Sequence, residues 1–184
     1  MPSIGCWSAE SRAVGWIYRL RQGLARIATL WRPPDVGPVR DILSAEAFAL
    51  FGSMSAADQG HSLEALRRLE RERPVSPDLA VAALLHDVGK VGGGLTLPYR
   101  SAIVLLEALR PQVLERLCDE AEGTWRAPFA ADANHAATGA ERCLAAGCSK
   151  WVAALVQYHD ASPKEVPDDL RADLERLQRA DDAS

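Results

Sequence analysis

The sequence predicts an all-α fold. Almost every segment of the 184 residues carries apolar residues at helical spacing, and residues that cap helices separate these segments. The Asn-Gly turns typical of β-hairpins do not mark the breaks. Hydrophobic residues make up 48% of the chain and aromatic residues only 6%, with Ala, Leu and Arg prominent, a balance that favours helices over sheets. A chain of this length can bury a core without disulfides.

Residues 1–34 are predicted to form an N-terminal amphipathic helix, an appendage to a domain over residues 35–184. An apolar stripe runs from about Ser11 to Trp31, and Pro33-Pro34 ends the helix. From Ser11 onwards this segment has five arginines and no acidic residue, a pattern also found in helices that lie on membranes or on a protein partner. The favoured interpretation is that the stripe packs on the domain while the arginines face water.

Further helices are predicted in order along the rest of the chain. One covers about Ser44 to Phe51, and the next begins at Ser55, where Asp58 completes a variant of the capping box, and extends to about Arg71. Ser76-Pro77 begins a helix that is expected to continue to Lys90 before a run of glycines. Residues 123–134 are predicted to be irregular, and the remaining helices are expected to begin near Ser101, Pro111, His135, Ser149 and Pro167.

The histidines form a pattern on these predicted helices. Two of them are followed directly by aspartate, as His86-Asp87 and His159-Asp160. His86 and His159 each continue an apolar stripe at i, i+3, i+4, i+7 spacing, so both imidazoles should face the core. Other ionisable residues also stand where an apolar one is expected, namely His61 and Asp181. Four helices are therefore predicted to converge on one polar centre.

A divalent metal ion would explain ionisable groups at core positions. Burial of an uncompensated carboxylate is costly, whereas one cation neutralises several carboxylates and accepts lone pairs from neutral imidazoles. A single core histidine would more simply be a packed, hydrogen-bonded residue, but four in one pattern favour the metal. Nitrogen and carboxylate ligands suit zinc, iron, manganese or, with more water, magnesium, and the spacing does not choose among them.

Lys90 is the candidate contact for an anionic substrate group. It follows His86 by four residues and Asp87 by three, which places its ammonium near the same helix face. The alternative is a solvated lysine that complements the helix C-terminus.

The ordered set of His61, the segment Leu-Leu-His86-Asp87-Val-Gly-Lys90 and the distal Asp181 resembles the HD superfamily of metal-dependent phosphohydrolases, from about Ser44 onwards. His-Ala-Ala-Thr-Gly-Ala-Glu from His135 and Tyr-His-Asp at 158 to 160 are similar to the extra histidines of the HDIG-like subset, which often binds two metals. The resemblance implies an HD-domain helical bundle with an extra N-terminal helix. Its first metal ion would be held by His61, His86, Asp87 and Asp181, and its second by His135, His159 and a bridging Asp87.

Two positions depart from that pattern. Asp160 stands where dinuclear relatives often have another histidine, so it would either supply a carboxylate ligand or turn away. The Gly-Tyr-Pro motif of cyclic-di-GMP hydrolases is absent after Lys90, which disfavours that substrate.

The resemblance implies an enzyme that hydrolyses a small phosphorylated substrate, such as a nucleotide, with Asp87 and Lys90 as catalytic residues and one or two divalent metal ions as cofactor. Such a cation lowers the pKa of a coordinated water. The alternative is a non-catalytic signalling or binding module in which the metal only holds helices together.

Charge and cysteine usage bound the partners and the compartment. A net charge of -4 supplies no basic field for nucleic acid, which is therefore not an expected partner. The four cysteines form no Cys-x-x-Cys pair, and the sequence has neither a secretory signal nor an apolar stretch of membrane-spanning length. These features predict a reduced, cytoplasmic protein.

Overall fold

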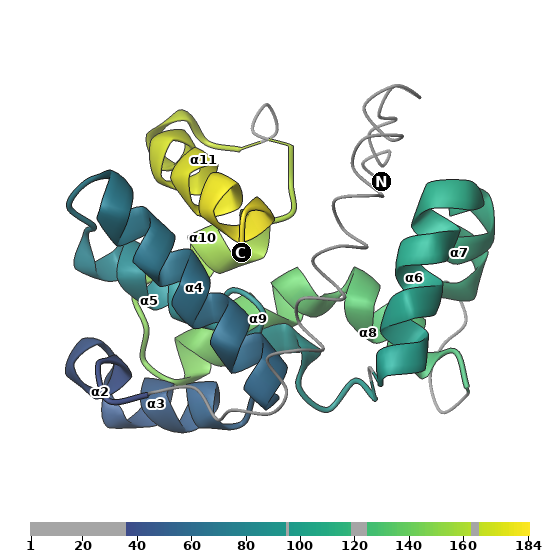
Figure 1. Cartoon of the computed structure of the whole chain (residues 1–184), viewed down its shortest axis with the longest axis horizontal. Helices are drawn as coiled ribbons and strands as arrows, with labels where there is room; N and C mark the ends of the chain where they lie inside the picture. The colour runs from purple at the N-terminus through teal and green to yellow at the C-terminus, as the bar shows by residue number, and fades with distance from the viewer. Residues whose placement is uncertain (1–35, 95, 119–124, 163–165) are drawn as a thin grey trace. The chain divides into compact units, whose positions relative to one another are not determined.

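The computed structural model describes residues 36–94, 96–118, 125–162 and 166–184. Every regular element in these ranges is a helix, which confirms the predicted all-α fold (Figure 1). The predicted N-terminal helix and the boundary near Pro33 lie outside the described residues. No helix within those ranges is long and apolar enough to cross a membrane.

The chain divides into two compact units. The smaller one includes Gly93–Ala133 and contains α6 (Leu97–Leu109), α7 (Pro111–Cys118) and α8 (Ala127–Ala133). The larger one, which carries all the predicted site residues, is built from the remaining described segments. Its elements are α2 (Val39–Ile42), α3 (Ala45–Gly52), α4 (Ala56–Glu72), α5 (Pro77–Leu85), the 3-10 turn η1 (Val88–Lys90), α9 (His135–Ala145), α10 (Lys150–Tyr158) and α11 (Asp168–Asp182).

Serine caps begin α3, α4, α5 and α10 of the larger unit. The hydroxyl oxygen of the N-cap serine accepts a hydrogen bond from a backbone N–H in the first turn, which satisfies a donor that the helix itself leaves without a partner. Each such cap contributes about 1 kcal/mol to helix stability. The four serines confirm the predicted starts of α3, α4, α5 and α10: Ser44, Ser55, Ser76 and Ser149.

The larger unit is organised around α5. Six of its nine residues are buried, because α5 packs against α4, α10 and α11 and so has neighbours on several sides. The buried face of α11 consists of Leu170, Leu174, Leu177 and Ala180, at the spacing predicted from the sequence. Since α4 also packs against α11, the polar residues that interrupt these apolar stripes are brought toward one another.

The structure corrects three predicted helix boundaries. The helix from Pro77 was expected to reach Lys90, but it ends at Leu85 and the chain continues as a turn and η1. Residues 127–133, predicted to be irregular, form α8, since a proline in the first turn of a helix removes no hydrogen bond. For the same reason Pro98 fits the first turn of α6, which begins at Leu97 rather than near Ser101.

Candidate metal centre

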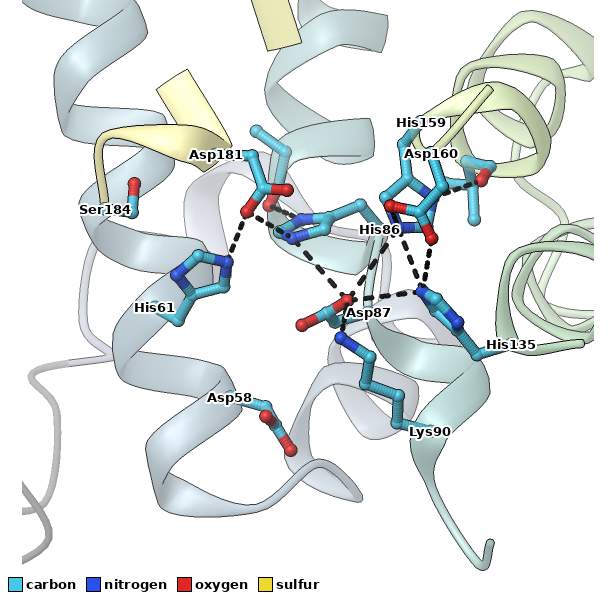
Figure 2. Close-up of polar contacts among 12 residues, drawn as sticks. Asp58, His61, His86, Asp87, Lys90, His135, His159, Asp160, Asp181 and Ser184 are labelled. Carbon is cyan, nitrogen blue, oxygen red and sulfur yellow. Dashed lines mark hydrogen bonds and ion pairs between the residues drawn. The ribbon is translucent and has the colours of Figure 1, made fainter. Parts of the chain in front are cut away.

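Two helices end in the same local structure, a histidine at the C-cap followed by aspartate. His86 follows α5, and its Nδ1 lies 3.0 Å from the carbonyl oxygen of Ala83. His159 follows α10, and its Nδ1 lies 2.7 Å from the carbonyl oxygen of Val156. Because a carbonyl only accepts hydrogen bonds, Nδ1 carries the proton in both rings. Each ring therefore directs Nε2 into the same region, as Figure 2 shows.

The first group of candidate ligands is His61, His86 and Asp181, whose ligand atoms all lie within 4.8 Å of one another. His61 comes from α4 and Asp181 from α11. Asp181 Oδ1 is 2.5 Å from His61 Nε2 and 3.3 Å from His86 Nε2. The His86 atom is buried and has no hydrogen-bond partner among the described residues, because the contact with Asp181 lacks hydrogen-bond geometry. A buried nitrogen in this state is a natural metal ligand.

The second group is Asp87, His135 and His159, again with ligand atoms within 4.8 Å of one another. The Nε2 atoms of His135 and His159 are 3.1 Å apart, and each lies 3.8 Å from Asp87 Oδ1. All three residues are buried. His135 is the first residue of α9, so the second group joins the His-Asp steps of α5 and α10 to a third helix.

Asp87 and His86 connect the two groups into one centre. Asp87 Oδ1 is also 3.8 Å from His86 Nε2, so one carboxylate oxygen faces imidazoles of both groups. The His86 ring lies 5.2 Å from the ring of His61 and 5.2 Å from that of His159, measured between centroids. By distance Asp87 belongs to the second group, and its assignment to both metal ions stays a prediction.

Asp160 lies beside the second group. Its carboxylate oxygens are 3.0 Å from His135 Nε2 and 3.4 Å from His159 Nε2. Within a helix two successive side chains point about 100° apart, but α10 has already ended at Tyr158, so His159 and Asp160 can face the same partners. The Asp160 side chain is 56% exposed, which places the second group next to solvent.

Lys90 contacts a carboxylate of the centre. Its Nζ lies 2.7 Å from Asp87 Oδ1, and its side chain is 17% exposed. The sequence predicted that this ammonium would contact a substrate anion. Because α5 ends at Leu85, Lys90 reaches the centre from η1 and not from a continued helix face, and the anion that it contacts there is Asp87.

The charged forms of His86, Asp87 and Asp181 stabilise one another in the centre. Burial alone would lower the pKa of His86, but the carboxylates of Asp87 and Asp181 outweigh it and raise this pKa to about 9. Burial likewise opposes ionisation of Asp87, yet Lys90 and His86 hold its pKa well below the ordinary value. The pKa of Asp181 is also held well below its ordinary value, by His86 and His61 against the effect of burial. Burial lowers the pKa of His159, which favours its neutral imidazole form.

Residues that the sequence interpretation missed hold η1 against α9. A Cβ placed on Gly89 would lie 1.8 Å from the carbonyl oxygen of His135, so only glycine allows this backbone contact. A Cβ on Gly139 of α9 would lie 3.0 Å from Val156 Cγ1 and 3.3 Å from the backbone nitrogen of Gly89, which is a less severe contact. Arg142 donates hydrogen bonds to the carbonyl oxygens of Val88 at 2.8 Å and Val91 at 3.0 Å. The two glycines were a signal in the sequence, but their pairing could not be found without the fold.

These residues fit a divalent metal ion. Bonds of about 2.1 Å place neighbouring ligand atoms roughly 3.0–3.4 Å apart in tetrahedral or octahedral coordination. The His86–Asp181 distance of 3.3 Å and the His135–His159 distance of 3.1 Å lie in that interval. The His61–Asp181 contact is shorter, at 2.5 Å, and the distances of 3.8 Å from Asp87 to His135 and His159 are longer, so small side-chain movements would complete each set. The donors are imidazole and carboxylate without thiolate, which suits zinc, iron, manganese or magnesium. The centre therefore contains two adjacent groups that could each hold a metal ion.

No protein-family model, curated protein or solved structure matches this chain.

Proposed function

We propose that this protein is a metal-dependent phosphohydrolase with the HD-domain bundle, which cleaves a phosphoester or phosphoanhydride bond in a small substrate such as a nucleotide. The observation that carries the proposal is the pairing of two buried His/Asp groups around Asp87. Adjacent divalent sites that share a carboxylate are typical of enzymes that displace an oxygen at phosphorus.

Each residue has a specific part in this proposal. His61, His86 and Asp181 would hold one metal ion, and Asp87, His135, His159 and Asp160 would hold the second. A bound divalent ion supplies a water of lowered pKa and neutralises charge on the phosphoryl oxygens. Lys90 carries the positive charge nearest to Asp87, and it would bind an anionic oxygen of the substrate at the edge of the second group.

Exposure favours a catalytic rather than a purely structural site. Structural metal sites are closed by protein ligands, whereas catalytic sites keep a position that water or substrate can reach. Here His86 is fully buried, but Asp181 is 25% exposed and Asp160 is 56% exposed. One side of the centre therefore belongs to the core, and the other is open to solvent at both groups.

A metal assay combined with a substrate panel tests the proposal. The full chain is loaded with manganese, iron, zinc or magnesium, and phosphate release is measured from nucleoside phosphates, dinucleoside polyphosphates, cyclic dinucleotides and p-nitrophenyl phosphate. We expect turnover that is lost in Asp87→Asn and retained in Lys150→Ala, whose exposed side chain is at the opposite end of α10 from His159.

The competing function is a signalling or binding module stabilised by metal. In that case the metal would raise the melting temperature of the wild-type chain, while none of the substrates would be cleaved with any of the four metals. That result would reject the phosphohydrolase and retain the metal centre. Absence of metal binding would reject both functions.

A further inference from the structure

The ammonium of Lys90 already lies against the second group of candidate ligands. The ammonium of Lys90 is 2.7 Å from Asp87 Oδ1, the same oxygen that lies 3.8 Å from the Nε2 atoms of His135 and His159. A metal ion in the second group would therefore have to coordinate Asp87 Oδ1, the oxygen that the Lys90 ammonium contacts.

The first group differs in this respect. The ion pairs of Asp181 within the described residues are with two imidazoles, His61 and His86. An imidazole nitrogen can itself coordinate a metal ion, whereas an ammonium has no lone pair at neutral pH and can only be moved aside. Occupation of the first group thus displaces no lysine side chain, whereas occupation of the second requires Lys90 to move away from Asp87 Oδ1.

We propose that Lys90 is a built-in counter-ion that competes with the second metal ion for Asp87 Oδ1, so that the two groups fill in order, the first before the second. The inference rests on the metal-binding part of the proposed function and not on hydrolysis. Lys90 keeps the buried carboxylate neutralised while the second group holds no metal, which avoids the cost of an uncompensated buried charge.

Displacement of the ammonium links metal loading to substrate binding. Once Lys90 has left Asp87, its charge becomes available to an anionic oxygen of the substrate at the solvent side of the centre. The predicted contact between Lys90 and phosphate is therefore expected only in the fully loaded protein. A chain with one metal ion would bind inorganic phosphate more weakly than a chain with two.

Calorimetric titration of the metal-free full chain with manganese tests the competition. We expect two binding events of unequal affinity in the wild type. In Lys90→Met the weaker event should tighten by about tenfold or more, because a positive charge next to the incoming cation has been removed, while the tighter event should change by less than about twofold. Lys90→Arg keeps the positive charge and should keep the difference in affinity between the two binding events. Lys150→Met is the matched surface control.

An unchanged or weaker second event in a folded Lys90→Met variant would overturn the inference. Reductive methylation of the wild type, read by mass spectrometry, covers the case in which that variant does not fold. Lys90 should be modified more slowly with one manganese equivalent than with two, and equal rates would also overturn it. If the wild type binds no manganese, zinc, iron or magnesium, the proposed function fails at its first step, so the two failures are distinguishable.

Discussion

Replacement of Gly89 by alanine should separate α9 from the turn that carries Asp87. The added Cβ would lie 1.8 Å from the carbonyl oxygen of His135, 2.6 Å from its carbon and 2.8 Å from the backbone nitrogen of Gly139. Cβ atoms essentially never approach closer than 3.0 Å, and all three neighbours are backbone atoms that cannot rotate away. The two elements must therefore move apart by about 1 Å or more, since overpacked contacts relax by backbone shifts.

The consequence for stability and for the site can be estimated from the contacts that such a shift breaks. Overpacking of this kind costs about 1–3 kcal/mol, and we expect the upper end because the hydrogen bonds of Arg142 to Val88 and Val91 are stretched at the same time. His135 contributes both the blocked carbonyl and an imidazole of the second group. The variant should therefore lose the second metal ion while it retains the first.

Urea unfolding followed by circular dichroism, together with elemental analysis, measures both effects. Gly60→Ala is the matched control, because Gly60 lies within α4 and a Cβ there would meet nothing within 4 Å. The control should be as stable as the wild type or more stable by up to about 1 kcal/mol, since alanine favours helix over glycine. A Gly89→Ala protein with wild-type stability and two metal ions would refute the close-contact reasoning.

Three further predictions concern the metal ligands. His86→Ala should abolish metal binding at the first group and lower the melting temperature, because the carboxylates of Asp87 and Asp181 lose a buried partner; retention of all metal in that variant would contradict the assignment. The double change His135→Ala and His159→Ala should leave about one metal ion per chain by elemental analysis, whereas a wild type that binds only one ion, unaffected by the double change, would indicate a mononuclear site. Metal affinity at the first group should rise by about tenfold per pH unit and level off near pH 9, the raised pKa of His86. The reason is that the His86 imidazolium must release a proton to bind metal, whereas Asp181 is already ionised. Calorimetry across this pH range measures the trend, and a metal affinity that fell as the pH rose would contradict the prediction.

Much of the fold follows from local sequence signals. A serine N-cap acts within its own first turn, so the starts of α3, α4, α5 and α10 could be predicted without knowledge of any neighbour. The inward direction of His86, His159 and Asp181 follows from the period of the helix, which is also local. The composition of the polar centre was therefore predictable from the sequence.

What the sequence by itself determined is which residues face the core, and what only the tertiary structure decided is how those residues are grouped. His61 and Asp181 meet across 120 positions, so their 2.5 Å contact depends on the packing of α4 against α11. The contact of Asp160 with His135 likewise depends on the packing of α10 against α9. Gly89 and Gly139 allow the backbones of η1 and α9 to come close together, because neither residue has a Cβ. This effect cannot be predicted until the two segments are known to be in contact. Periodicity specifies the direction of a side chain on its own helix, whereas distances between helices are set by packing of the whole core.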